Sequence, residues 1–235
     1  MKKYYNITGL TVAMESFGRT EAQAEPYRCD PVDKPDIVID PRWQWLKDKA
    51  PYLSDDDCAY LASGSSFYNQ LLGYGGMMLH SSAVMMDGWA YLFSAPCGTG
   101  KSTHTTLWRK YFGEERARIL NDDKPALRFE NGRFYAYGTP WSGKTDQNIN
   151  IRVPLAGVCM LRRGETNTIR PYAGAKAIHD LLEQTTRPSD PSRMGNLLDL
   201  LDKLMTTVSV WELHCNMDPE AARVSYEAMS AGRKE

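Results

Sequence analysis

The chain has 235 residues, of which 42% are hydrophobic and 24% charged, as in an ordinary soluble globular protein. A formal net charge of −1 offers no basic surface to nucleic acid or to an anionic membrane. A membrane-spanning helix needs about 18 consecutive apolar residues, and no stretch of the sequence comes close to that length. No apolar signal segment follows the first residues. The five cysteines are scattered without a CxxC pair, so we expect reduced thiols and a cytoplasmic location.

The first third of the chain predicts a small β-rich unit. Residues 4–14 alternate enough to form a strand, and residues 35–40 contain a second, short strand. Residues 43–45, with two tryptophans, and an acidic turn at residues 55–57 close this unit. We therefore expect a β-rich N-terminal subdomain at residues 1–60 and a second domain at residues 61–235.

The rest of the chain alternates strand and helix patterns after a short helix at residues 67–72. A turn at Asp87-Gly88 divides residues 82–93 into a hairpin. Further strands are expected at residues 117–120, 125–129, 133–137, 153–161 and 208–215. Helices are expected at residues 102–111, 173–185 and 192–206, and a last one after Asp218-Pro219. This alternation predicts an α/β fold.

The most specific motif is Ser-Ala-Pro-Cys-Gly-Thr-Gly-Lys-Ser-Thr at residues 94–103. Gly100, Lys101 and Ser102 fit the invariant end of a P-loop, and Ala95 replaces its leading glycine. An apolar strand pattern precedes the segment and a helical pattern follows it, which is the context of a P-loop. The alternative is a glycine-rich turn whose lysine is only solvated.

The chemistry of phosphate binding explains these residue types. Gly98 and Gly100 let backbone N–H groups approach phosphate oxygens, and the helix start adds its unpaired N–H groups. Lys101 is expected to reach the β- and γ-phosphates, and the Ser102 hydroxyl to hold Mg²⁺. The expected nucleotide-binding set is Pro96, Cys97, Gly98, Thr99, Gly100, Lys101, Ser102 and Thr103.

A second candidate group, Asn121-Asp122-Asp123, lies about twenty residues beyond the loop, at the end of a predicted strand. One carboxylate there can complete the Mg²⁺ shell through water, and the other can accept the proton of an attacking hydroxyl. The alternative is a polar Asx turn before Pro125.

A long polar loop at residues 138–150 carries Trp141 and Lys144. Long polar loops with an exposed aromatic often recognise ligands. Lys144 could add positive charge at the transferring phosphoryl group; alternatively, the loop is a surface segment whose Trp141 covers the sheet edge. His104, in the first helical turn after Ser102, faces either the nucleotide or the solvent, and Arg162-Arg163 receives no role.

Three segments together, residues 80–88, 94–103 and 120–123, resemble the catalytic core of the HPr kinase/phosphorylase superfamily. That superfamily includes the P-loop half of phosphoenolpyruvate carboxykinases, and the resemblance covers about residues 75–165. It implies a P-loop core with ATP and Mg²⁺ as ligands. It also implies that His80 lies near the γ-phosphate, that Asp122 is the general base and that Asp123 belongs to the second shell of the metal.

The resemblance implies a kinase that transfers the γ-phosphoryl group of ATP to a hydroxyl acceptor, either a serine of a peptide or protein or a small metabolite. The chain is similar to short HPr-kinase-like proteins, some found near clusters that make modified peptides. HPr itself is a doubtful substrate, because the segment with which true HPr kinases grip it has no counterpart here.

Two alternatives stay open: a carboxykinase-like enzyme, and a non-catalytic nucleotide-binding module that assists a biosynthetic partner. Full carboxykinases are about twice as long and carry a separate substrate domain. HPr-kinase relatives are often oligomers, so the resemblance also implies a homo-oligomer.

Overall fold

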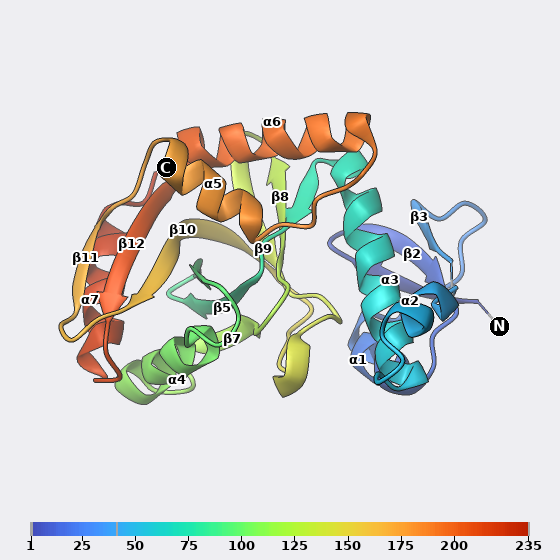
Figure 1. The fold of residues 1–235 in the computed structure, drawn as a ribbon, viewed down its shortest axis with the longest axis horizontal. Coiled ribbons are helices and arrows are strands. Elements are labelled where there is room, and N and C mark those ends of the chain that lie inside the picture. The colour runs from blue at the N-terminus through green and yellow to red at the C-terminus, as the bar shows by residue number, and fades with distance from the viewer. Residues whose placement is uncertain (1, 41, 235) are drawn as a thin grey trace.

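The computed structural model describes residues 2–40 and 42–234 and has a mixed α/β fold with two separate sheets. The smaller sheet has the strand order β1-β2-β3 and lies on the right of Figure 1, at the N-terminal end. Its strands and the helices beside it are β1 (Lys3–Ile7), β2 (Leu10–Met14), β3 (Ile37–Ile39), α1 (Gly18–Ala24), η1 (Glu25–Tyr27), α2 (Gln44–Lys49) and α3 (Asp55–Leu71).

The expected single strand at residues 4–14 is a β-hairpin in the structure, so that prediction is wrong in one respect. Thr8 and Gly9 both have a positive φ, at 58° and 79°. Two successive positive φ angles form the tight turn whose twist matches an antiparallel pair of strands. The chain therefore reverses direction at these two residues, and β1 pairs with β2.

Helix α3 replaces both the expected acidic turn at residues 55–57 and the expected short helix at residues 67–72. The Ser54 hydroxyl accepts a hydrogen bond from the backbone N–H of Asp57 at 3.0 Å and caps the helix. The acidic residues lie in the first turn, where the helix dipole stabilises negative charge. The helix runs continuously through residue 60, so no chain break marks the boundary expected there; the division into two domains stays a prediction.

The larger sheet has nine strands, in the order β4-β8-β9-β10-β6-β5-β7, with β12 beside β10 and β11 beside β12. The long strand β10 pairs with β9 in its first residues and with β6 and β12 further on, with a register shift between Leu155 and Gly157. The strands are β4 (Gly76–Met78), β5 (Ser81–Met86), β6 (Trp89–Ser94), β7 (Arg118–Asn121), β8 (Ala126–Glu130), β9 (Arg133–Tyr137), β10 (Arg152–Arg163), β11 (Thr168–Pro171) and β12 (Ser209–Cys215).

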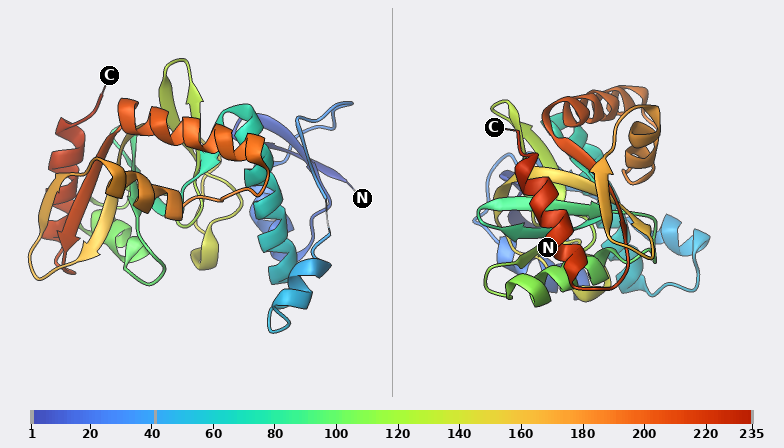
Figure 2. Two further views of the ribbon diagram at one scale, coloured as in Figure 1. Left: turned by 45° about the horizontal axis from the view of Figure 1, so that its top comes forward. Right: turned by 90° about the vertical axis from the view of Figure 1, so that its left-hand side faces the viewer.

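Helices cover both faces of this sheet. Successive side chains of a strand point to opposite faces, so Tyr91 and Phe93 pack in the core under α4 and α7, and Leu92 packs in the core under α5 and α6. The second view of Figure 2 shows α6 above the sheet and α4 below it. The helices are α4 (Lys101–Phe112), α5 (Ala175–Glu183), α6 (Pro191–Thr207) and α7 (Glu220–Ala231).

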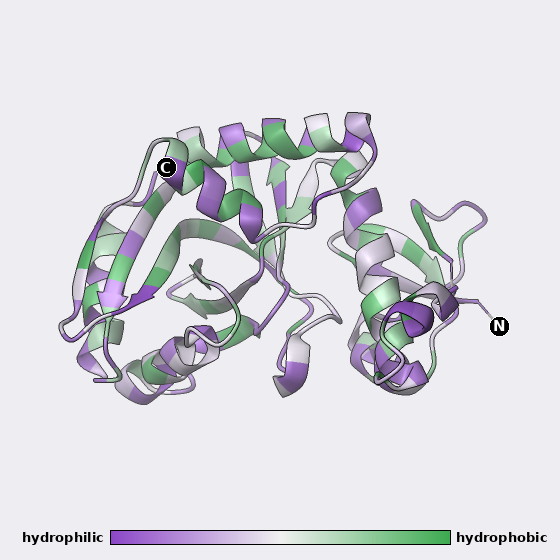
Figure 3. Cartoon of the chain, viewed as in Figure 1, coloured by the Kyte–Doolittle hydropathy of each residue, from purple (hydrophilic) through white to green (hydrophobic). Residues whose placement is uncertain are grey.

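The predicted strands and helices from residue 82 onward are confirmed, with end points within a few residues of those expected. The short strands β4 and β11 were not expected. None of the helices in the described part combines the length and the hydropathy that crossing a membrane requires. Figure 3 shows hydrophobic colour along most of β10 and hydrophilic colour on part of the short helix η3 (Gly143–Thr145), which lies between the larger sheet and α3 in that view.

Candidate functional site

The glycine-rich loop connects β6 to α4, as the sequence predicted. Gly98 and Gly100 have φ angles of 77° and 121°, values that other residues rarely adopt. Among the described residues, a Cβ at Gly98 would meet nothing within 4 Å, and one at Gly100 would meet only the Cβ of Thr103 at 4.0 Å. In the part of the chain that the structure describes, no side chain caps the start of α4, so the loop and the first helical turn leave backbone N–H groups for an anion.

The side chain of Lys101 folds back onto the start of this loop. Its side chain is largely buried, and its ammonium donates a hydrogen bond to the carbonyl oxygen of Ala95 at 2.9 Å. Burial lowers the pKa of Lys101, and the charge of the nearby Asp123 opposes that effect. Ser102 and Thr103 follow with exposed side chains.

The two adjacent aspartates have different partners. Asp122 is buried, and its two carboxylate oxygens accept hydrogen bonds from the Ser82 hydroxyl at 2.5 Å and the Thr145 hydroxyl at 2.8 Å. Asp123 lies 3.1 Å from Nε2 of His80 and forms an ion pair with Lys124. Asp122 is thus held by neutral hydroxyls, and Asp123 by a lysine and a histidine.

These partners decide the ionisation of Asp123. Burial raises the pKa of its carboxyl group, but the hydrogen bond from His80 and the charge of Lys124 outweigh burial and lower the pKa to about 2. Asp123 is therefore an anion at neutral pH and a weak proton acceptor.

The polar turn considered as an alternative is also present. The Asn121 side-chain oxygen accepts hydrogen bonds from the backbone N–H groups of Asp123 at 3.0 Å and Lys124 at 2.8 Å. This Asx turn ends β7 and lets the neighbouring carboxylates both reach one cavity. The Asx turn is therefore part of the candidate site and not an alternative to it.

A cavity of about 670 Å³ joins the loop, the aspartates and the 143–145 segment. Ten of the twelve candidate residues line it: His80, Cys97, Gly98, Gly100, Lys101, Ser102, Thr103, Asp122, Asp123 and Lys144. Pro96 and Thr99 do not line it; they line an adjoining depression with Arg162 and Arg163. The structure thus brings the separate sequence motifs to one place, while the role of each residue stays a prediction.

The N-terminal unit supplies part of the same cavity, which the sequence did not reveal. Nε of Arg19 donates to a carboxylate oxygen of Asp146 at 2.9 Å, and its guanidinium lies 4.2 Å from the ring centre of Tyr60. The Tyr60 hydroxyl in turn accepts a hydrogen bond from the backbone N–H of Gly143 at 3.2 Å. The cavity residues not predicted are Arg19, Leu53, Asp57, Tyr60, Leu61, Lys124, Gly143 and Thr145.

A sequence signal existed for three of these residues. Gly143 and Thr145 flank Lys144 in the polar loop that the sequence singled out, and Lys124 directly follows the aspartate pair, where its position could have suggested a counter-ion. Arg19 lies more than a hundred residues from Asp146 along the chain, and no local pattern marks such a pair.

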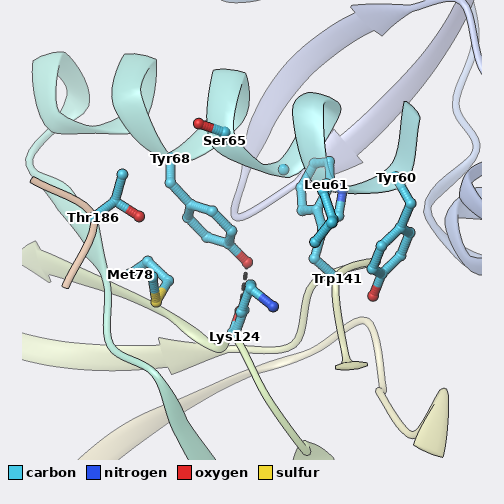
Figure 4. A pocket seen from close by; sticks show the side chains of 9 residues that line it. Tyr60, Leu61, Ser65, Tyr68, Met78, Lys124, Trp141 and Thr186 are labelled. Carbon is cyan, nitrogen blue, oxygen red and sulfur yellow. Dashed lines mark hydrogen bonds between the residues drawn. The ribbon is translucent and has the colours of Figure 1, made fainter. Parts of the chain in front are cut away.

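Trp141 is not the exposed aromatic that the loop suggested. It is 1% exposed and stacks on Phe67 with ring centres 4.9 Å apart. A Cβ at Gly64 would lie 2.8 Å from its ring, so α3 needs glycine there to pack against it. Figure 4 shows Trp141 beside Tyr60 and Tyr68, in the wall of a small cavity of about 100 Å³. The polar loop is therefore anchored in the hydrophobic core beside α3.

His104 does not face the solvent. It is 2% exposed, and its Nε2 lies 3.1 Å from the Ser225 hydroxyl and 3.3 Å from the indole nitrogen of Trp108. Burial lowers its pKa to about 3, so it is neutral at physiological pH. It joins α4 to α7 in the core.

The residues fit a magnesium ion that is held jointly with a nucleotide. Within residues 2–40 and 42–234 no group of three or more histidines, cysteines or carboxylates could hold a metal by itself. Mg²⁺ commonly takes one or two protein oxygens, waters and substrate phosphates instead of a complete protein cage. The Ser102 hydroxyl and the ionised Asp123 line the same cavity, which is the donor set that this mode requires.

The fold and the cavity define a mixed α/β protein with a strand, glycine loop and helix beside a pair of carboxylates. No protein-family model matches the sequence, and no curated protein matches it either. Among solved structures, the Hpr(Ser) kinase/phosphatase from Coxiella burnetii aligns with 66% of this chain and 95% of its own, at 10% identity and a TM-score of 0.39.

Proposed function

We propose that this protein is a kinase that transfers the γ-phosphoryl group of ATP, with Mg²⁺, to a hydroxyl group of an acceptor. The observation that supports this proposal most directly is the shared cavity of the glycine loop, Lys101, His80 and both aspartates. A module that only binds nucleotide has no need of two carboxylates with separate sets of partners. Phosphoryl transfer requires little beyond positioning and charge stabilisation, and this cavity contains groups for both.

The loop and Lys101 are proposed to hold the phosphates. Backbone N–H groups at the start of α4 would bind the phosphate anion, and the Lys101 ammonium would exchange its bond to the Ala95 carbonyl for phosphate oxygens. Ser102 and Asp123 would hold Mg²⁺, directly and through water. The ion would neutralise negative charge on the phosphates during transfer.

Asp122 is proposed to be the general base. The acceptor oxygen attacks the γ-phosphorus, the bond from that phosphorus to the bridging oxygen breaks, and the hydroxyl proton passes to Asp122. The hydroxyls of Ser82 and Thr145 fix the orientation of this carboxylate. Asp123 suits this step less, because its pKa of about 2 makes it a weak base.

The acceptor is proposed to enter between the 143–145 segment and the N-terminal unit. Tyr60, Leu53 and Leu61 line the same cavity as the phosphate loop. Arg19 holds the segment in place through Asp146. Lys144 would then add positive charge where the phosphoryl group leaves ATP.

The test is transfer of labelled phosphate. The protein is incubated with Mg²⁺ and ATP labelled at the γ-position, with serine-containing peptides and small hydroxyl metabolites as acceptors. We expect acid-stable label on an acceptor with the parent protein and its loss with Asp122→Asn. If no acceptor is labelled and calorimetry detects no ATP binding, the proposed function is wrong.

A further inference from the structure

A second cavity of about 540 Å³ adjoins the glycine loop. Gly98, Gly100 and Thr103 line both this cavity and the one that contains the aspartates. These three residues therefore form the divide between the two spaces. A molecule that crosses the loop at this point would occupy both.

The two cavities differ in chemistry. The first is lined by three aspartates, three lysines and an arginine, whereas no aspartate, glutamate or lysine is among the described residues that line the second. Leu107 of α4, Leu161 of β10 and the exposed Met217 supply apolar surface to the second cavity. Such a wall suits an uncharged, flat group better than a phosphate.

Arg163 lies at the edge of the second cavity. It is exposed, and its guanidinium donates a hydrogen bond to the carbonyl oxygen of Gly98 at 2.7 Å. No carboxylate of the described residues forms an ion pair with Arg163, whereas the neighbouring Arg162 forms ion pairs with Glu212 and Asp180. The planar guanidinium of Arg163 is therefore free to stack on an aromatic ring.

We propose that the second cavity is the nucleoside site, with the base between the apolar wall and Arg163. This inference rests on the proposed function, because it places the triphosphate across Gly98, Gly100 and Thr103 and its γ-phosphate in the first cavity. The phosphates then meet the cavity that contains the lysines and the aspartates, and the base meets the cavity with Leu107, Leu161, Met217 and Arg163. Arg163, which received no role from the sequence, becomes a nucleotide-binding residue.

The experiment compares two probes, ATP and inorganic tripolyphosphate, each with Mg²⁺, by calorimetry. Tripolyphosphate has the phosphate chain but no nucleoside. We expect Arg163→Ala and Met217→Ser each to weaken ATP binding by about fivefold to tenfold and to leave tripolyphosphate binding unchanged. Lys101→Ala should weaken binding of both probes, and the exposed Arg187→Ala is the matched control for removal of an arginine.

The outcomes separate this inference from the proposed function. If Arg163→Ala and Met217→Ser leave the affinity for ATP within about twofold of the parent, or weaken both probes equally, the nucleoside lies elsewhere while the phosphate loop stands. If the parent protein binds neither probe, the proposed function fails, and the nucleoside site fails with it. Circular dichroism of each variant checks that the fold is intact; both substituted side chains are exposed.

Discussion

Nε2 of His80 lies 3.1 Å from a carboxylate oxygen of Asp123, and this contact joins the start of β5 to the end of β7. Lys124 pairs with the other oxygen of the same carboxylate. Among the described residues, the carboxylate of the neighbouring Asp122 has the hydroxyls of Ser82 and Thr145 as hydrogen-bond partners. Two adjacent carboxylates with such different surroundings are suited to different tasks. Asp123 is suited to hold a positive ion, and Asp122 to accept a proton.

The first prediction separates the two aspartates. Asp122→Asn should keep ATP affinity within a few fold and lower transfer by about 10² to 10⁴, because an amide cannot accept the hydroxyl proton. Asp123→Asn should instead raise the Mg²⁺ concentration needed for ATP binding. Single-turnover transfer and Mg²⁺ titrations measure the two effects. If the two variants exchange these effects, Asp123 is the base.

The second prediction concerns Lys101. Lys101→Ala should weaken ATP–Mg²⁺ binding by about 1.5–3 kcal/mol, because a charged contact to phosphate is lost. Lys110→Ala, an exposed lysine on the same helix, is the control and should bind ATP like the parent. Calorimetry measures both variants. An unchanged affinity for ATP in Lys101→Ala would show that the loop does not bind phosphate.

The third prediction concerns Lys144. Lys144→Ala should reduce transfer by more than it reduces ATP binding, because its charge matters most when the phosphoryl group is between donor and acceptor. The comparison uses single-turnover rates against the dissociation constant for ATP. Equal losses in both quantities would make Lys144 a simple binding residue. Tryptophan fluorescence is not a suitable probe of this loop, since Trp141 is fixed in the core.

The fourth prediction concerns Glu212 and acid stability. Its side chain is 2% exposed; burial raises the pKa of the carboxyl group, but hydrogen bonds from Arg170 and Arg162 outweigh burial and lower it. The Glu212 carboxyl group therefore binds a proton more readily in the unfolded chain than in the folded one. The ion pairs of Glu212 stabilise the fold fully above about pH 4.5, the ordinary pKa of a glutamate. This stabilisation is lost as the pH falls below that value. Glu212→Gln should be less stable at pH 7 and should lose less stability than the parent between pH 5 and pH 3.

Urea unfolding at a series of pH values measures the free energy of unfolding of both proteins. Urea carries no charge, so it does not screen the ion pairs as a salt would. Parallel pH curves for parent and variant would show that the Glu212 ion pairs do not contribute to acid sensitivity.

The fifth prediction concerns Trp141. Trp141→Ala should lower the free energy of unfolding by about 3–5 kcal/mol, because it leaves a cavity beside Phe67 and Gly64. Trp45→Ala, at a half-exposed tryptophan, should change it by no more than about 0.5 kcal/mol. Denaturant unfolding checks both variants. A mild effect of Trp141→Ala would mean that the loop is not anchored by this side chain.

The sequence by itself determined the strand, glycine loop and helix around Lys101 and most elements after residue 82. These features depend on local physics: φ angles that only glycine tolerates, helix-start chemistry and the periods of apolar residues. The sequence also identified the aspartate pair, because a carboxylate at the end of a strand beyond such a loop commonly completes the Mg²⁺ shell.

Only the tertiary structure decided how Trp141, Arg19 and the two aspartates are used. Burial of Trp141 depends on Gly64 and Phe67, far away in the chain, and the contact of Arg19 with Asp146 joins α1 to the loop after η3. Asp122 and Asp123 are identical in sequence terms, and their difference arises from Ser82 and Thr145 on one side and His80 and Lys124 on the other. Such contacts form when distant segments pack together, so local sequence patterns carry no signal of them.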